Sequence, residues 1–240
     1  KAYVEGGYAL CLACARLVDE QNSAPEETAR REAGLLLDLL TPIAKSWPSQ
    51  WCLEANSLAI QVHGGYGYTR DFPVEQYWRD NRLNMIHEGT HGIQAADLLG
   101  RKVLMENGKG LQLLAARMAA TAKKASGVPE LAAFAQQLTG ALQQVGEATQ
   151  AAWAGGEPTQ ALANAVPYMQ AFGHTVLAWI WLDVALTALN NDATLSIAAN
   201  AGRLGAIRYF YHYELPKMGA WLNVVNARDM TCAALAEEAF

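Results

Sequence analysis

The chain is 240 residues long, with 52 % hydrophobic and 17 % charged residues. This composition excludes an intrinsically disordered chain, because disorder requires few apolar and many charged residues. The 18 basic and 23 acidic residues leave a formal net charge of −5. A nucleic-acid-binding surface needs a stripe of positive charge, and the basic residues here cluster only in pairs such as Arg30-Arg31. We therefore expect a folded protein that does not bind nucleic acid.

The sequence predicts neither a membrane span nor a disulfide framework. The most apolar stretch, residues 176–189, is interrupted by Asp183 and falls short of the ~20 apolar residues that a span needs. It predicts a buried helix, and we expect His174, just before it, to be a core or edge histidine. Four cysteines are too few for a stapled secreted domain, so we expect a reducing compartment, the cytoplasm.

Apolar residues recur with a helical period from the start of the chain and outline three helices. Ser23, Pro25 and Glu26 are residue types found at a helix start, so they predict a capping box that opens the second helix. Gly64-Gly65 ends the third helix. The three apolar stripes are Leu10, Ala13, Cys14, Leu17 and Val18; Leu35, Leu36, Leu39, Leu40 and Ile43; and Trp51, Ala55, Leu58, Ala59 and Val62.

Two shorter helices are expected to follow. The first opens at Pro73 and ends at Arg82, and the second begins near Thr90 and runs to about Glu106. The segment 107–110 (Asn-Gly-Lys-Gly) is the stop signal for the second.

Beyond residue 110 the sequence changes to long Ala-rich helices separated by loops that contain Gly, Pro or Asn. We expect Pro167 to kink one of them. Residues 195–213 are apolar on more than one side, which predicts a helix enclosed by its neighbours. No segment alternates with period two. The sequence therefore predicts an all-α protein: an up-down helical bundle over residues 1–108, then a second helical bundle over residues 109–240.

A zinc site is one interpretation of the stretch 61–101, which departs from the plain helical pattern. Residues 87–91 (His-Glu-Gly-Thr-His) match H-E-x-x-H, in which two histidines one helical turn apart bind zinc and the Glu activates water. Gly89 and Thr90 are poor helix formers inside a motif that must be helical, and no third ligand stands out. We expect no metal site, and a zinc metallopeptidase is kept as an alternative.

The other interpretation places Glu88 in a loop just before a helix that starts at Thr90. The free amides of a helix start favour an anion or an oxyanion there, although a glutamate at such a place often has no chemical role. The Gly-rich residues 64–67 follow a helix, which excludes a dinucleotide-binding βαβ unit. Cys11 and Cys14 lack the second pair that a structural zinc site needs, so we expect them to pack in the core.

Four motifs together resemble the C-terminal helical domain of the acyl-CoA dehydrogenases. Their order and spacing match over residues 61–94, and the flanking helices fit the same domain. The part after residue 110 resembles the extension of the longer members, including the bacterial 3-methylthiopropionyl-CoA dehydrogenase group. The motifs are Gln61-x-x-Gly64-Gly65-x-Gly67-Tyr68, Pro73-Val74-Glu75, Arg79-Asp80 and Glu88-Gly89-Thr90-x-x-Ile93-Gln94.

This resemblance implies an FAD enzyme that oxidises an acyl-CoA thioester to the trans-2-enoyl-CoA. It implies that Glu88 removes the α-proton while the β-hydrogen leaves as a hydride to the flavin. Gly89 then adjoins the substrate, and Thr90 contacts the flavin pyrophosphate. The residues implied to contact FAD, in the family usually across a subunit interface, are Gln61, Val62, Gly64 and Gly65.

The implied partners are an acyl-CoA, an electron-transfer flavoprotein or similar acceptor, and a second copy of the chain. We expect a homodimer, because the added bundle is in a position to cover the face that shorter members use to form tetramers. His87 stands where the family commonly has Tyr, so the pocket wall beside the base differs.

The sequence also suggests that the chain is part of a longer protein. It starts at Lys1 inside a helical pattern, without an initiator Met or a signal sequence. The family's N-terminal helical domain and β-domain lie outside these residues. We therefore expect the fragment alone to bind neither FAD nor acyl-CoA firmly and to be inactive. A non-catalytic helical interaction module is the second alternative.

Overall fold

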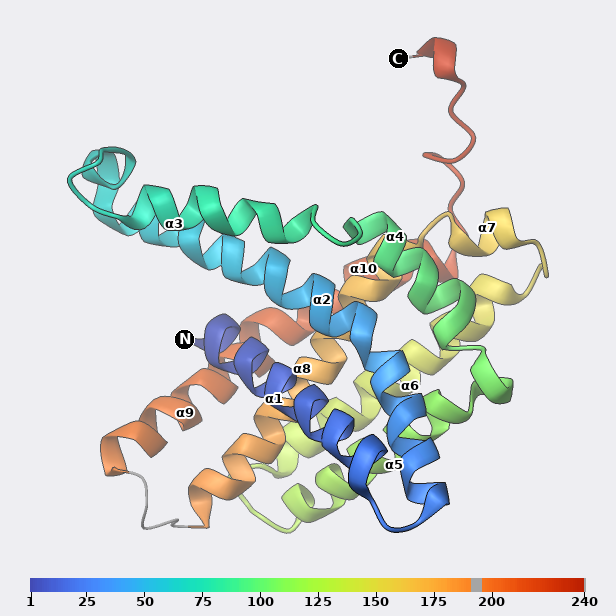
Figure 1. The fold of residues 1–240 in the computed structure, drawn as a ribbon, viewed down its shortest axis with the longest axis horizontal. Coiled ribbons are helices and arrows are strands. Elements are labelled where there is room, and N and C mark those ends of the chain that lie inside the picture. The colour runs from blue at the N-terminus through green and yellow to red at the C-terminus, as the bar shows by residue number, and fades with distance from the viewer. Residues whose placement is uncertain (191–195, 240) are drawn as a thin grey trace. The chain divides into compact units, whose positions relative to one another are not determined.

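The computed structural model describes residues 1–190 and 196–239 (Figure 1). Over these residues the secondary structure is helical and contains no strand, which confirms the prediction of an all-α protein. The chain divides into two compact units: unit 1 spans Lys1–Gln94 and unit 2 spans Ala95–Phe240. The predicted domain boundary near residue 108 remains a prediction.

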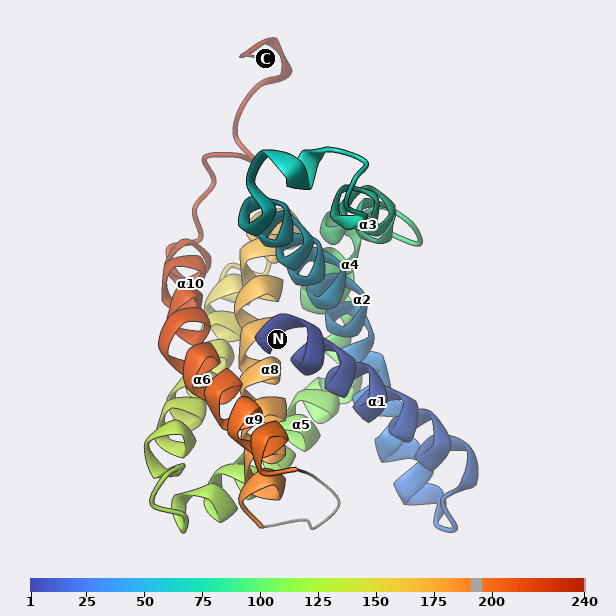
Figure 2. The same ribbon diagram turned by 90° about the vertical axis from the view of Figure 1, so that its left-hand side faces the viewer.

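Unit 1 is built on a helical hairpin. Helix α1 spans Ala2–Ser23 and helix α2 spans Glu27–His63, and the two lie side by side (Figures 1 and 2). Gly7 of α1 faces Pro48 of α2 so closely that a Cβ on Gly7 would lie 3.4 Å from the Pro48 Cβ. The ring of Tyr3 meets the Trp47 ring edge-on, with centroids 6.1 Å apart. A small residue on α1 therefore lets the two backbones approach.

Helix α2 is one continuous helix of 37 residues, whereas the sequence pattern indicated two. It contains Pro42 and Pro48, each of which removes an N–H and costs ~3 kcal/mol or more in a helix interior. Pro42, Ile43 and Trp47 are all buried, and α1 packs along the helix. Burial of this stripe therefore outweighs the cost of the prolines.

The predicted capping box at the start of α2 is wrong. Ser23 is the last residue of α1, and its hydroxyl donates to the Asp19 carbonyl oxygen at 2.6 Å. Helix α2 begins at Glu27 without a side-chain cap. The hydroxyl is used by the turn that precedes it, as serine side chains near a helix end often are.

Short helices complete unit 1. They are η1 (Gly64–Tyr68), α3 (Val74–Asn81), η2 (Arg82–Met85) and α4 (His91–Asp97), of which α4 crosses the boundary between the units. Three of them, η1, α3 and η2, pack against α2. The predicted helix end at Gly64, the short helix after Pro73 and the helix start near Thr90 are confirmed.

The predicted stop near residue 107 is also present, within α5 (Met105–Ser126). Glu106, Asn107 and Gly108 have φ values of +48°, +55° and +78°, so the helical path is broken there. Before this kink a π-helical segment, η3 (Leu98–Lys102), follows α4. The single helix expected over residues 90–106 is therefore interrupted twice.

Unit 2 is a helical bundle around α8 (Ala165–Leu189), which contacts α5, α6 (Ala132–Trp153), α9 (Ile197–Tyr209) and α10 (Met218–Asn226) (Figure 2). Helix α8 is buried on all sides over residues 168–178 and partly buried over the remainder, which confirms the predicted buried helix. It is long and apolar enough to cross a membrane by length and composition, but 67 % of its most apolar window is buried inside the structure. The short segments of unit 2 are α7 (Pro158–Leu162), η4 (Phe210–Glu214), η5 (Leu215–Lys217) and η6 (Glu237–Ala239).

Three expectations about side chains are wrong. Pro167 lies in the first turn of α8, where a missing N–H breaks no helical bond, so it does not kink a helix interior. Helix α9 is largely exposed, with Ile197 91 % exposed; Leu195, the start of that predicted stripe, lies outside the described residues. Cys11 is exposed and not packed in the core, because its side of α1 faces away from the buried stripe.

A buried polar cluster in unit 2 ties α8 to η4 and η5. His174 is fully buried, its Nδ1 lies 3.0 Å from the Gln170 carbonyl oxygen, and its Nε2 lies 3.7 Å from a Glu214 carboxylate oxygen. Lys217 donates to Glu214 at 2.6 Å, and the Tyr209 hydroxyl donates to it at 3.0 Å. Burial lowers the pKa of His174, although the nearby Glu214 carboxylate opposes this shift. His174 is therefore a core histidine, as expected.

Candidate functional site

The loop that carries Glu88 lies between η2 and α4 and has an unusual backbone. Glu88 has φ +53° and Gly89 has φ +99°, both in the left-handed region. A non-glycine residue there costs of the order of 1–2 kcal/mol and is found most often where function requires it. The amides of Ile86 and His87 both donate to the Leu83 carbonyl oxygen at 3.0 Å, which anchors the loop to η2.

The other side of the loop is anchored to α4. The Gln94 amide donates to the Thr90 carbonyl oxygen at 3.0 Å, so Thr90 precedes the first turn of the helix. The Gln94 side-chain amide donates to the Glu88 carbonyl oxygen at 3.2 Å. A Cβ on Gly89 would lie 2.8 Å from that same amide nitrogen and would displace it, and the φ of +99° strains any residue other than glycine. The interpretation of Glu88 as a loop residue before a helix is confirmed.

This backbone does not support the zinc alternative. The left-handed residues 88 and 89 separate His87 from His91, which is the first residue of α4, so the two imidazoles do not project from one helical turn. Over residues 1–190 and 196–239, no group of three or more His, Cys, Asp or Glu side chains is placed to hold a metal ion.

The Glu88 side chain is 78 % exposed and lines a pocket of about 370 Å³ in unit 1. Its carboxylate oxygen lies 3.6 Å from Nε2 of His87, which lines the same pocket. Lys45 of α2 also lines the pocket and donates through its ammonium group to the Asn84 carbonyl oxygen of η2. The other lining residues are Ala44, Pro48, Ser49, Cys52, Asn81 and Asn84.

Two further groups set the electrostatics around this loop. His91 is half-buried, and its Nε2 is buried without a hydrogen-bond partner among the described residues. Burial lowers the pKa of His91, and the nearby charges of Lys45 and Arg82 lower it further. Burial likewise raises the pKa of the Cys52 thiol. Near neutral pH the His91 ring is therefore uncharged, and Cys52 is a thiol.

The predicted FAD-contacting residues lie together at the C-terminal end of α2. Gln61, Gly64 and Gly65 are exposed, Val62 is 85 % exposed, and a Cβ at either glycine would meet nothing within 4 Å. Gly67, by contrast, is buried, and a Cβ there would lie 2.6 Å from the Ile60 carbonyl oxygen. The chain thus makes a tight turn at Gly67, and the backbone at Gly64 and Gly65 is accessible from solvent.

No residue of the 61–65 segment lines the pocket that contains Glu88. Cys52, which lines the Glu88 pocket, and Gln61 are nine residues apart on α2, which corresponds to about 13 Å along the helix. The structure brings together Glu88, Gly89 and Thr90 in one loop and the residues of the 61–65 segment at one helix end.

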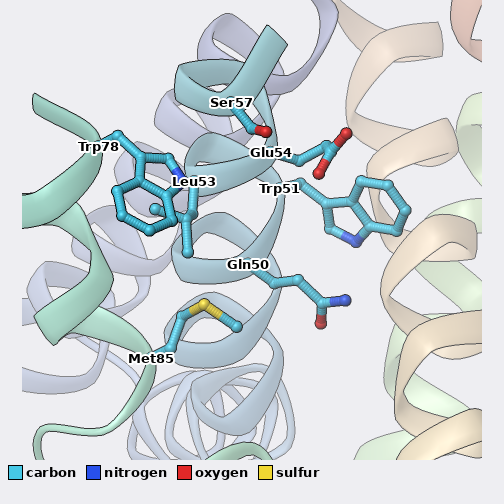
Figure 3. Close-up of a pocket in the computed structure, with 7 residues that line it drawn as sticks. All are labelled: Gln50, Trp51, Leu53, Glu54, Ser57, Trp78 and Met85. Carbon is cyan, nitrogen blue, oxygen red and sulfur yellow. The ribbon is translucent and has the colours of Figure 1, made fainter. Parts of the chain in front are cut away.

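A second pocket in unit 1, of about 490 Å³, contains none of the predicted site residues. In Figure 3, Trp78 of α3 and Met85 of η2 lie on the same side of α2 as Leu53, and Trp51 and Glu54 extend from the other side of the helix. Gln50 and Ser57 complete its lining. It is a mainly apolar groove beside α2 without the polar loop that marks the Glu88 pocket.

Sequence reasoning missed the residues that hold the Glu88 loop. The ammonium group of Lys45 contacts a carbonyl 39 residues away, and no local pattern signals such a contact. The pair formed by His87 and Glu88 was visible only as part of a zinc motif. Gln94 belongs to the motif that carries the resemblance, but its hydrogen bond to Glu88 depends on the turn between them.

Comparison with known proteins gives matches over both parts of the chain. Two protein-family profiles match: "Acyl-CoA dehydrogenase, C-terminal domain" over residues 1–104 and "Acetyl-CoA dehydrogenase C-terminal like" over residues 114–236. The 3-methylmercaptopropionyl-CoA dehydrogenase of Ruegeria pomeroyi is 36 % identical over 212 residues, which cover 86 % of this chain and 35 % of that protein.

Solved structures share the fold. The Caenorhabditis elegans protein ACDH-11, solved in complex with C11-CoA, matches 97 % of this chain and 38 % of its own with a TM-score of 0.68 at 17 % identity. An acyl-CoA dehydrogenase from Bacillus anthracis, solved with FAD, matches 93 % of this chain and 38 % of its own with a TM-score of 0.61 at 17 % identity. This chain thus spans a little over a third of each relative, and it belongs to the acyl-CoA dehydrogenase family.

Proposed function

We propose that this chain is the C-terminal part of an FAD-dependent acyl-CoA dehydrogenase, in which Glu88 is the base that removes the α-proton of the acyl thioester. The observation that carries the proposal is the strained backbone at Glu88, which holds a carboxylate at the edge of a pocket directly before a helix start. Strain of this kind is retained where the surrounding structure and the function require it.

The chain's own residues account for the proton transfer. An α-proton next to a thioester is weakly acidic, so a base must be held close to the carbon while donors stabilise the charge that develops on the carbonyl oxygen. The Glu88 carboxylate accepts the proton, and Gly89, the next residue in the same left-handed turn, adjoins the thioester. When bound, the flavin supplies the acceptor for the hydride that leaves the β-carbon.

The residues at the end of α2 fit a role in holding FAD. Gln61, Val62, Gly64 and Gly65 are exposed, and the open space at both glycines lets a ligand approach the backbone. We propose that Thr90, which precedes α4, contacts a phosphate of FAD through its hydroxyl.

The exposed apolar side chain of Val62 supports a dimer. We propose that the 61–65 segment, which does not line the Glu88 pocket, contacts the FAD of a second subunit. The proposed partners are therefore a second copy of the chain, an acyl-CoA substrate and an electron-transfer flavoprotein or similar acceptor. The four free cysteines fit a reducing compartment such as the cytoplasm.

The test is flavin reduction by an acyl-CoA in the full-length protein that contains this segment. Glu88→Gln keeps the size of the side chain but removes the base, so we expect FAD to stay bound while the rate of flavin reduction falls by at least about a hundredfold. The matched control is Glu54→Gln, which removes a carboxylate from the other pocket of unit 1 and is expected to leave the rate unchanged.

The outcomes separate the alternatives. Normal flavin reduction by the Glu88→Gln protein would show that Glu88 is not the base. A full-length protein that binds no FAD would instead favour the non-catalytic helical module. The isolated 240-residue chain is expected to bind neither ligand firmly, because most of the length of its relatives lies outside it.

A further inference from the structure

We infer that His87 is a positioning residue for Glu88, one that holds the carboxylate through an ion pair across the mouth of their shared pocket. The inference rests on the proposed function of Glu88. His87 Nε2 lies 3.6 Å from the Glu88 carboxylate oxygen, and both side chains line the pocket beneath them. Neighbouring residues rarely face each other in a regular helix, so the contact depends on the left-handed turn at Glu88.

The backbone on each side of the pair is fixed. The His87 amide donates to Leu83 of η2 at 3.0 Å, and the Lys45 ammonium group ties η2 to α2 through the Asn84 carbonyl oxygen. On the other side, the Gln94 side chain donates to the Glu88 carbonyl oxygen at 3.2 Å. Each member of the pair is therefore held by an anchor of its own, and the freedom that remains is in the two side chains.

The pair makes the orientation of the carboxylate depend on the charge of one imidazole. A protonated His87 attracts the ionised Glu88 carboxylate, which is the form that accepts a proton. A neutral imidazole offers only a weaker hydrogen bond. The contact, at 3.6 Å, is longer than a hydrogen bond, and such contacts in catalytic sites often shorten once substrate is bound.

Other charged or titratable groups face the same loop and have to be kept constant in a test. Lys45 and Cys52 of α2 line the pocket, and Arg82 of η2 and His91 of α4 lie close to the loop. Lys45 and Arg82 keep their charge throughout the range in which histidine titrates. The ring of His91 is half-buried and is the one group that also changes protonation on the acid side. All four remain in place when only residue 87 is replaced.

The first measurement is the rate of flavin reduction at saturating acyl-CoA in the full-length protein from pH 5.5 to 8.5. We expect the ratio of the wild-type rate to the His87→Phe rate to rise from about one at pH 8.5 to about two- to fivefold at pH 5.5, as for an exposed ion pair. The conservative variant His87→Gln keeps a donor without a titrating charge, so we expect it to restore part of the rate and to lose the pH dependence of the ratio.

The second measurement does not depend on activity. The mobility of the His87 ring is measured by NMR relaxation in the 240-residue chain, with its signal assigned by its absence in His87→Gln. We expect Glu88→Gln to make the ring more mobile, because the contact with the carboxylate is lost. The matched control for both measurements is His212→Gln, which removes an exposed histidine of unit 2 outside the site.

A rate ratio that stays flat with pH would overturn the inference, and so would an unchanged mobility of the His87 ring in Glu88→Gln. Both results are distinct from failure of the proposed function, which would appear as normal flavin reduction in Glu88→Gln. Because residue 87 is exposed, its replacement is expected to leave the fold intact, and circular dichroism of each variant checks this.

Discussion

Glu88 belongs to two sequence motifs that predict different local structures, and the fold decides between them. In the sequence it belongs equally to a zinc pattern and to the motif of the acyl-CoA dehydrogenases. In the structure its φ of +53° and the glycine after it exclude the helix that the zinc pattern needs. The identity of the residue came from the sequence, whereas its exposure, its contact with His87 and its anchor through Gln94 depend on the turn.

His174 gives a prediction at the same scale. Burial lowers the pKa of His174, so in the acid range the unfolded chain binds more protons than the folded chain. The free energy of unfolding is therefore expected to be constant above the ordinary histidine pKa of about 6.5 and to fall as pH drops below it. The slope from one such group approaches about 1.4 kcal/mol per pH unit.

The variant His174→Gln isolates this contribution. We expect it to be less stable than wild type by about 1–2 kcal/mol at pH 8, since it disturbs a fully buried contact, and to lose less stability on acidification. Denaturant unfolding of the 240-residue chain between pH 5 and 8 measures both. His91, whose pKa is also lowered by burial, is present in both proteins and cancels in the comparison. Equal acid-side slopes would contradict the prediction.

At the scale of elements, the crossing of α1 and α2 depends on Gly7. A Cβ there would lie 3.4 Å from Pro48 and 3.8 Å from Trp47, which leaves room for a methyl group but not for a longer side chain. We expect Gly7→Ala to be tolerated or slightly stabilising, because alanine favours the helix, and Gly7→Leu to lower the free energy of unfolding by about 1–3 kcal/mol. Thermal unfolding of the two variants measures the difference.

The matched control is Gly140→Leu in α6, where a Cβ would meet nothing within 4 Å. A side chain there extends into open space, so we expect its effect to be small. If Gly7→Leu were no more destabilising than Gly140→Leu, the close approach of the two helices in unit 1 would not be the constraint.

Helix ends were predicted better than helix continuity. Gly64 ends α2 as its sequence suggested, since its φ of +60° suits glycine. The two apolar stripes over residues 35–62 were expected to form two helices, but they lie on one helix, whose buried stripe around Ile43 holds it together across its prolines. Pro167 was read as a kink because its helix was expected to begin earlier; the observed start at Ala165 places it in the first turn. Where a helix starts and whether it continues through a proline depend on which of its apolar faces pack against other helices.

At the scale of the whole molecule, the exposed C-terminal end of α2 predicts that dimer formation and FAD binding depend on each other. Val62 is 85 % exposed, and the proposed role of its segment is to contact the FAD of a second subunit. In the full-length protein we expect Val62→Asp to weaken the dimer and to lower the flavin content together, because a charge is introduced where an apolar contact is expected. Sedimentation and flavin absorbance of the same sample measure the two properties.

Ile197→Asp is the control, since it places the same charge at a 91 % exposed apolar residue of unit 2. We expect it to remain a dimer with full flavin content. A Val62→Asp protein that also stays dimeric and retains its flavin would contradict the assignment of the 61–65 segment to a subunit interface.

The sequence by itself determined the all-α class, most helix ends and the residue types of the candidate site. Helical periodicity, glycine stops and the spacing of the Glu88 motif are local properties that a single sequence carries. The tertiary structure decided which stripes are buried, that α2 runs through two prolines, that α9 is exposed, and that His87 and Lys45 lie around Glu88. These outcomes depend on contacts between residues that are far apart in the chain. The energies of such contacts outweigh local helix preferences, and the contacts produce no pattern in the local sequence.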